Sequence, residues 1–183
     1  VIGTQQWMSN NLDVAFYRNG DPIPQVTDAA TWSGLTTGAW CYYNNDSTQG
    51  SSYGKIYNWY AVNDPRGLAP MGWHVPTDDE WTTLTTTLGG AAVAGGKLKK
   101  AGTLNWTSPN TAGNNNSGFG ALPGGYREIF GAYSNINING FWWSSTENFL
   151  SVPIYRYLEY TNGAIVSNIN NKKYGFSVRC VRD

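Results

Sequence analysis

The sequence has few charged residues, and this shortage excludes several classes of protein. Charged side chains make up 13% of the 183 residues, and 12 basic residues balance 12 acidic ones. Because the basic residues are scattered and the net charge is zero, the chain lacks the electrostatic footprint of a nucleic-acid-binding protein. No apolar run approaches the roughly 20 residues that span a bilayer. We therefore expect no nucleic-acid partner and no membrane insertion.

Histidine and cysteine are also scarce, which limits metal binding and catalysis. A structural zinc site needs ligands in close pairs, and His74 with two distant cysteines does not supply them. One histidine without a surrounding motif also argues against a Ser-His-Asp triad. His74, between Trp73 and Val75, fits a hydrogen-bonded core residue better than a catalytic base. We expect no catalytic residue, no metal site and no cofactor, and predict a protein that is not an enzyme.

What the sequence does contain is aromatic side chains, at 15% of all residues, including nine Trp and twelve Tyr. These give a large apolar area to bury, and the length suits one domain over residues 1–183. The chain opens at Val1 without a Met. We therefore expect the C-terminal part of a longer protein, in which regions outside this chain form any homo-oligomer.

Local patterns predict two helices, a long loop and then a sheet. One helix is predicted over Gly54–Val62. The second begins with a capping box of Thr77 and Glu80, buries Trp81, Leu84 and Leu88, and ends at Gly89-Gly90. Residues 103–118 are rich in Asn, Thr, Ser and Gly and are typical of a surface loop. Strands are predicted at 6–8, 39–43, 119–126, 141–145, 152–160, 164–168 and 176–181. This order predicts an α+β fold with a mainly antiparallel sheet.

The C-terminal third alternates between two compositions. Blocks rich in Gly, Trp, Arg and Cys lie at 124–127, 142–147 and 175–180. The stretches between them, 132–139, 148–155 and 160–171, consist mostly of Asn, Tyr, Ser, Thr, Ile and small or apolar residues. The blocks indicate a scaffold, and the stretches indicate a surface that is free to vary. The Asn- and Ser-rich stretches are also typical of ordinary turns, but the block pattern favours a binding module.

Several blocks in order carry a family resemblance. They include GTQQW at 3–7, GAWCYYNND at 38–46, YGKIYNWYAV at 53–62, GWHVPT at 72–77, LPGGYR at 122–127, WWSSTE at 142–147 and the segment 175–183. Together they resemble the Fibrobacter succinogenes major paralogous domain, a branch of the C-type lectin fold related to formylglycine-generating enzymes. The resemblance implies a C-type-lectin-like domain with long irregular loops.

The same architecture carries the variable proteins of diversity-generating retroelements. There, error-prone copying of adenines rewrites Asn codons into Tyr, Ser, Thr, Ile, Val, Phe, Leu, Ala and similar residues without creating stop codons. Residues 129–171 of this chain show that spectrum, while Pro153, Glu159 and Lys172-Lys173 fit it less well. The resemblance therefore implies a diversified binding surface on an extracellular protein, either on a phage tail or on a bacterial cell surface.

Strand alternation indicates which residues face a ligand. Tyr155, Tyr157 and Glu159 share one face of a strand and Leu158 lies on the other, where we expect it to join the core. Paired exposed tyrosines, with Asn and Ser around them, match the composition of antibody paratopes. The predicted ligand-binding residues are Ser134, Asn135, Asn137, Asn139, Phe141, Asn148, Phe149, Leu150, Ser151, Tyr155, Tyr157, Asn162, Ala164, Val166, Asn168 and Asn170. The expected partner is a protein or glycan receptor on a cell surface.

Three other functions stay open. A calcium-dependent lectin would need a Glu-Pro-Asn-type motif that is missing, but aromatic side chains can bind sugar without calcium, in a module of a surface lipoprotein or adhesin. A formylglycine-generating-like enzyme would need a close cysteine pair. A purely structural module is the third.

Several side chains carry structural expectations. The blocks around Cys41 and Cys180 belong in this family to the sheet that closes the domain, which implies neighbouring cysteines and a disulfide in an oxidising compartment. The alternative is two small buried hydrophobes. Trp106 is the one tryptophan expected to be available to a ligand. Arg127, Arg179 and Arg182 are expected to bridge Glu147 or backbone carbonyls.

Overall fold

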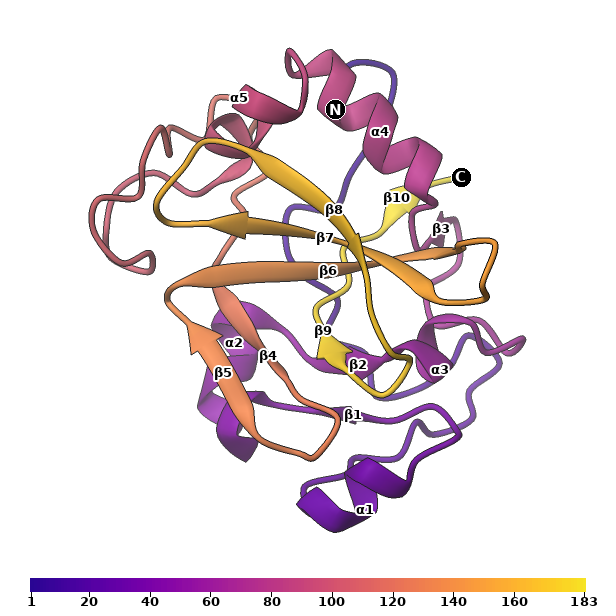
Figure 1. The fold of residues 1–183 in the computed structure, drawn as a ribbon. Helices are drawn as coiled ribbons and strands as arrows, with labels where there is room; N and C mark the ends of the chain where they lie inside the picture. Colours follow the sequence, from indigo (N-terminus) through magenta and orange to yellow (C-terminus); the bar gives the residue numbers. More distant parts are fainter.

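The computed structural model describes residues 1–183 and shows short helices around a mainly antiparallel sheet (Figure 1). The helices are α1 (Ala29–Gly34), α2 (Gly50–Tyr53), α3 (Trp59–Val62), α4 (Asp78–Thr87) and α5 (Ala91–Leu98). The strands are β1 (Trp40–Cys41), β2 (Ile56–Asn58), β3 (Trp73–His74), β4 (Gly124–Arg127), β5 (Tyr133–Ile136), β6 (Asn139–Glu147), β7 (Pro153–Glu159), β8 (Ile165–Ile169), β9 (Gly175–Phe176) and β10 (Val181–Arg182). None of the helices is long and apolar enough to cross a membrane.

The main sheet runs in the order β1-β2-β9-β4-β6-β7-β8, with β5 paired to β4, and β10 pairs with β3 in a separate two-stranded sheet. Every strand pair is antiparallel except β4 with β6, which meet in parallel at Gly125 and Gly140. Helices α4 and α5 lie beside β7 and β8, and α1 lies at the other end of the sheet (Figure 1). The predicted α+β fold with a mainly antiparallel sheet is confirmed.

Strand β6 is buried on both faces and separates the two largest clusters of the core. Phe141 and Trp143 pack in one cluster with Tyr57, Trp59 and Phe176. Trp142, between them in the chain, packs in the other cluster with α4 and α5. Successive side chains of a strand point to opposite faces. The three consecutive aromatic residues therefore connect both halves of the core through one strand.

Helix α4 begins as the sequence predicts. The Thr77 side chain accepts a hydrogen bond from the Glu80 backbone N–H, and the Glu80 carboxylate accepts one from the Thr77 N–H, so the capping box is complete. Trp81 and Leu84 are buried. The ring of Trp81 lies 4.7 Å from that of Trp7 and 6.0 Å from that of Phe119, measured between centroids. The helix therefore holds the N-terminal segment against the rest of the core.

The sequence did not predict helix α5, because Gly95 and Gly96 are poor helix formers. Both glycines are needed for packing. A Cβ at Gly95 would collide with the backbone oxygen of Ala164, and one at Gly96 would collide with that of Ala112. The Gly96 N–H also donates to the Gly163 oxygen at 2.9 Å. The helix therefore forms against the turn between β7 and β8, which approaches its backbone closely.

The helix predicted over Gly54–Val62 is wrong in its first half. Ile56–Asn58 form β2, which pairs with β1 and β9, and only Trp59–Val62 are helical. The Asn58 side chain accepts a hydrogen bond from the Ala61 N–H at 3.1 Å and so caps the helix. Sheet pairing thus decided the conformation of residues whose spacing also suited a helix.

The predicted neighbourhood of Cys41 and Cys180 is also wrong. Both cysteines are free and buried, and they belong to different core clusters. Cys41 lies on β1, which pairs with β2, whereas Cys180 precedes β10, which pairs with β3. Burial raises the pKa of both thiols, that of Cys180 to about 12. The alternative interpretation, two small buried hydrophobes, describes them.

Trp106 is not available to a ligand. It is 1% exposed, and its Nε1–H donates to the Ala121 oxygen at 2.9 Å. The predicted arginine contacts are confirmed in part. Arg127 donates to the backbone oxygens of Val26, Thr27 and Gly131, and Arg179 to those of Ser9 and Phe119. Arg182 instead reaches the side chain of Gln6, and Glu147 pairs with Lys172.

Trp81→Ala should lower the free energy of unfolding by about 3–5 kcal/mol, because it removes an aromatic side chain that is 1% exposed and leaves a cavity between Trp7 and Phe119. Chemical denaturation of both proteins measures this difference. Met71→Ala, at a residue 84% exposed, is the control and should stay within about 0.5 kcal/mol. Equal losses for the two variants would contradict the packing of α4.

Candidate functional site

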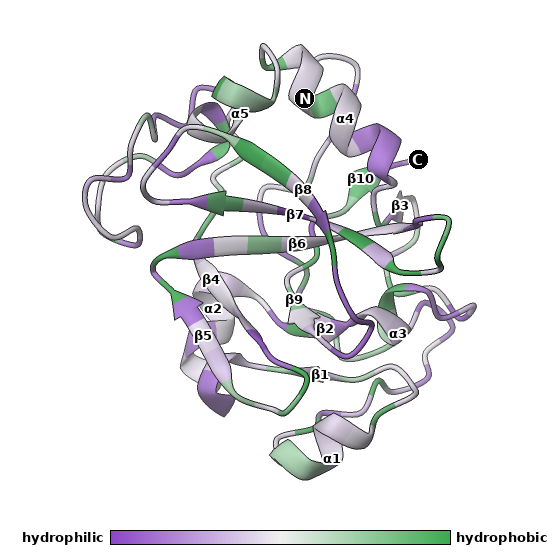
Figure 2. Ribbon diagram, in the orientation of Figure 1, coloured by the Kyte–Doolittle hydropathy of each residue, from purple (hydrophilic) through white to green (hydrophobic).

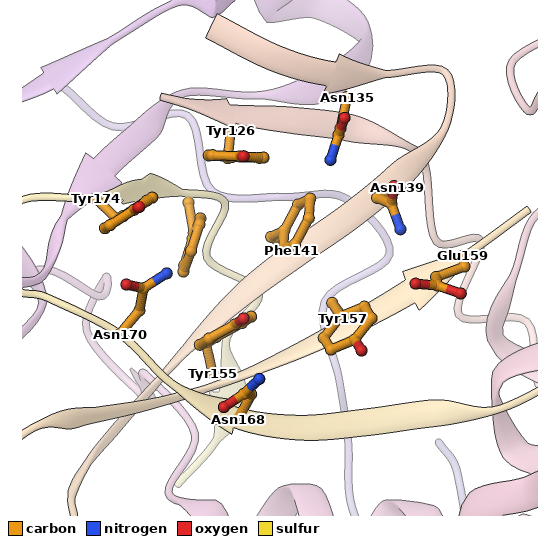
Figure 3. A pocket seen from close by; sticks show the side chains of 11 residues that line it. Tyr126, Asn135, Asn139, Phe141, Tyr155, Tyr157, Glu159, Asn168, Asn170 and Tyr174 are labelled. Carbon is orange, nitrogen blue, oxygen red and sulfur yellow. The ribbon is translucent and has the colours of Figure 1, made fainter. Parts of the chain in front are cut away.

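A pocket of about 280 Å³ opens on one face of the main sheet, at β4 to β9. Figure 3 shows its side chains, which come from six strands and from the segment before β9. The lining residues are Tyr126, Asn135, Asn139, Phe141, Tyr155, Tyr157, Glu159, Asn168, Asn170, Tyr174 and Phe176.

Strand register explains why these side chains meet. Tyr157 lies opposite Phe141 of β6 and Val166 of β8, and Tyr155 lies opposite Asn168. Residues directly opposite each other in antiparallel strands point to the same face of a sheet. The pocket therefore forms from rows of side chains that run across β6, β7 and β8, which explains why residues distant in the chain share it.

Six rings form the floor of the pocket, and we call them the aromatic floor: Tyr126, Phe141, Tyr155, Tyr157, Tyr174 and Phe176. Phe141 lies at their centre, with its centroid 4.9 Å from Tyr126, 5.3 Å from Phe176 and 5.8 Å from Tyr157. Phe141, Phe176 and Tyr155 are buried, whereas Tyr126, Tyr157 and Tyr174 are half-buried. The prediction of two exposed tyrosines is therefore wrong for Tyr155, and Tyr157 is only partly exposed. The floor is therefore continuous with the core on one side and open on the other.

Four amides surround the aromatic floor, and we call them the amide rim: Asn135, Asn139, Asn168 and Asn170. Figure 3 shows the first two on one side of the rings and the last two on the other. The Oδ1 atoms of Asn168 and Asn170 accept from the N–H groups of the following residues at 2.8 and 2.9 Å. Their NH₂ groups are left to donate to a ligand.

The pocket carries one ionisable carboxylate, that of Glu159, whose Oε2 accepts from the Asn162 side chain at 2.8 Å. Burial raises the pKa of Tyr155, and the neighbouring hydroxyls of Tyr157, Tyr126 and Tyr174 raise it further. At neutral pH the Tyr155 hydroxyl therefore keeps its proton and can donate as well as accept. The arrangement suits binding through ring faces and neutral polar groups.

The structure brings seven of the predicted site residues into this pocket: Asn135, Asn139, Phe141, Tyr155, Tyr157, Asn168 and Asn170. Two more lie beside it. Val166 pairs with Tyr157 on the same face, and Ser134 pairs with Tyr126 and donates to Glu128. Leu158, predicted to point to the core, is buried as expected.

The remaining predicted residues do not line this pocket, and their part in ligand binding stays a prediction. Asn137 accepts from the Tyr53 hydroxyl and lines a different pocket. Asn148 accepts from the backbone of Leu150 and Val152 and so builds the loop between β6 and β7. This loop carries Ser151 and the exposed side chains of Phe149 (94%) and Leu150 (65%), and it is partly green in Figure 2. Asn162 and Ala164 lie in the turn beside α5.

Four lining residues were missed: Tyr126, Glu159, Tyr174 and Phe176. Alternation along the chain had placed Glu159 on the face of Tyr155 and Tyr157, so a local signal for it existed. Tyr126 and Phe176 lie inside the scaffold blocks, which were taken as purely structural. No local signal marked Tyr174, because only strand pairing brings it beside Tyr126, at 5.9 Å between centroids.

His74 lies outside this pocket and is bound at both ring nitrogens. Nε2 lies 2.7 Å from Glu80 and Nδ1 lies 2.7 Å from Asp183. Partial burial lowers its pKa, but the hydrogen bonds to Asp183 and Glu80 outweigh burial, and the net pKa is raised. The histidine is satisfied as predicted, although with a side chain 36% exposed it is not a core residue.

His74→Gln should destabilise the protein more at about pH 5.5 than at about pH 8.5. A raised folded-state pKa means that the stabilisation is full below the unfolded pKa and is lost as the pH rises through the folded pKa. Solvent screening limits the effect to about 1 kcal/mol or less. Urea unfolding of both proteins at the two pH values measures it, and a pH-independent difference would exclude the two ion pairs.

With this geometry in place, the comparisons with known proteins give one finding. The family described as the Fibrobacter succinogenes major domain matches residues 1–182, and the chain belongs to that family. A search of curated proteins and a search of solved structures each returned no match. The C-type-lectin-like form of the fold therefore stays a prediction.

Proposed function

We propose that this member of the Fibrobacter succinogenes major domain family is a ligand-binding module without catalytic activity, and that its pocket holds part of a receptor on a cell surface. The observation that carries the proposal is the aromatic floor inside an amide rim. Tyrosine and asparagine give contact area and adaptable hydrogen bonds at a low entropy cost, as they do in antibody paratopes. Covalent catalysis uses a nucleophile paired with a base, and the lining residues supply no such pair.

The size of the pocket supports a small binding element. Sites for drug-sized ligands measure roughly 300–1,000 Å³, and this pocket, at about 280 Å³, falls just below that range. It suits one side chain or one sugar unit of a larger receptor. The surrounding surface then contributes the rest of the contact, including the β6–β7 loop with Phe149 and Leu150.

The residue types of the pocket support diversification by a retroelement. The four rim residues are Asn, and Tyr155 and Tyr157 are types that mutation of Asn codons reaches. The pocket also lies on strands whose other face is packed with Trp142 and Leu158. The exposed rim residues Asn135 and Asn168 can therefore change without removing core contacts, whereas Asn139 is buried and donates to the Leu158 oxygen. The proposed setting is an extracellular protein, in a phage tail or on a bacterial surface, with a C-type-lectin-like fold.

A carbohydrate-binding module of a surface lipoprotein or adhesin is the second candidate. The half-buried rings of Tyr157 and Tyr174 beside the amides of Asn168 and Asn170 favour it, because ring faces and amides together match the apolar faces and hydroxyls of a sugar. Under this candidate the rim would be constant and the DNA would hold no template repeat.

The double variant Asn168→Ala with Asn170→Ala should weaken binding to an array of bacterial glycans and to a panel of intact bacteria by about tenfold or more, since it removes two donors at the pocket. Asn116→Ala, at an exposed Asn of the long loop, is the matched control and should bind like the unmodified protein. Melting temperatures check that all variants fold. Unchanged binding by the double variant would refute the pocket as the ligand site.

The coding DNA tests diversification separately. We expect a nearby non-coding repeat of the C-terminal segment, which differs from the gene only where the repeat has adenine, and codons of the rim residues should lie among the differing positions. Sequencing several isolates would show the same positions varying. Differences spread over all four bases would exclude the retroelement and leave an invariant module.

A further inference from the structure

We propose that the pocket recognises a methylated ammonium group, in an inference that rests on the proposed function and names the chemistry of its ligand. A trimethylammonium group is a permanent cation with an apolar surface, and such groups bind to the faces of aromatic rings. The inference depends on three observations: the charge of the pocket, the state of its rings and the hydrogen-bonding capacity of its rim.

The charge of the pocket favours a cation. No lysine or arginine lines it, and Glu159 is its one carboxylate. The cation whose charge acts on Glu159 is Lys99, which is fully buried and donates to the backbone oxygens of Thr111, Glu159 and Asn162 at 2.8 Å each. Lys99 is therefore fixed by carbonyl groups outside the pocket, and Glu159 is the charged side chain that lines it.

No lysine or arginine side chain of this protein stacks on a ring of the aromatic floor. Elsewhere the chain stacks lysine and arginine on rings repeatedly, for example Lys55 over Trp40 at 4.5 Å, Arg127 over Trp32 at 4.4 Å and Arg179 over Phe119 at 4.2 Å. None of the rings used in these contacts belongs to the pocket. The rings of the floor that are partly exposed are those of Tyr126, Tyr157 and Tyr174, which are half-buried.

The rim favours a methylated ammonium over a primary one. A primary ammonium brings three N–H donors that need acceptors. The ring faces offer none, and the oxygens that are still free to accept, Oε1 of Glu159 and the Oδ1 atoms of Asn135 and Asn139, lie around the rings in Figure 3. A trimethylammonium group has no N–H, so it loses nothing when it contacts ring faces instead of acceptors.

Three ligands that share one shape and differ in charge test the inference on the intact chain. Choline is the cation, 3,3-dimethyl-1-butanol is its neutral isostere and 3,3-dimethylbutyrate is an anion with the same tert-butyl group. Titration calorimetry and ligand-observed NMR should show choline bound about fivefold or more tighter than the neutral isostere, with the anion weakest. A neutral isostere that binds as tightly as choline, or more tightly, would overturn the inference. So would the absence of binding by all three.

Two variants locate the interaction, each with a folding check by thermal melting. Glu159→Gln keeps the contact with Asn162 and removes the charge, so it should reduce choline binding severalfold and leave the neutral isostere unchanged. Asp79→Asn, at an exposed carboxylate of α4, makes the same change in net charge away from the pocket and should have no effect. Tyr157→Leu should lower choline binding by removing one ring face. If neither Glu159→Gln nor Tyr157→Leu changes choline binding, the cation binds elsewhere and the inference fails.

The same titration also tests which kind of molecule carries the ammonium group. A trimethyl-lysine peptide presents this cation on a protein, and free phosphocholine presents it on a headgroup. The ligand that binds more tightly identifies the receptor class. These outcomes are distinct from failure of the proposed function. If Asn168→Ala with Asn170→Ala abolishes cell binding while choline does not bind, the pocket is still the ligand site and only the ammonium chemistry is wrong.

Discussion

The buried contact between Asn11 and Arg179 is the interaction on which the rest of the structure depends. The Oδ1 of Asn11 accepts from two nitrogens of Arg179, at 2.7 and 3.1 Å, and from the Nε1 of Trp142 at 2.9 Å. Its Nδ2 donates to the Tyr53 oxygen. A guanidinium that is buried this deeply is tolerated only when its N–H groups are satisfied. One amide thus joins the N-terminal segment, α2, β6 and the C-terminal segment, and it fixes the strand that carries both clusters of the core.

The residues of the pocket differ in how far the fold depends on them. Phe141, Tyr155 and Phe176 belong both to the aromatic floor and to the largest core cluster, so any change there alters folding as well as binding. The exposed rim residues Asn135 and Asn168 have few packing contacts to lose. Arg127 and Arg179 donate to backbone oxygens of the core, and no basic side chain lines the pocket. A stable floor with an adjustable rim is what a diversified binding surface requires.

The parts of the fold that sequence reasoning predicted depend on neighbours within a few residues. The capping box of α4 depends on Thr77 and Glu80, three positions apart, and the strands predicted at 141–145, 152–160 and 164–168, which form β6, β7 and β8, depend on alternation. The errors occurred where distant segments decide. Ile56 has the spacing of a helix residue but pairs in the sheet, and Gly95 lies in a helix because the β7–β8 turn packs against it. Cys41 and Cys180 lie apart because the first and last strands pair with different partners.

For the candidate site, the sequence by itself determined the residue types and the face of each strand. It placed Tyr155 and Tyr157 opposite Leu158, since the alternation of side chains along a strand is a property of the backbone and needs no partner. Only the tertiary structure decided which strands lie side by side. It places Tyr126 and Tyr174 in the same pocket as those tyrosines, and it places Phe149 and Asn137 outside that pocket. Strand order and register depend on the free energy of the whole packed core, and no short stretch of sequence contains that information.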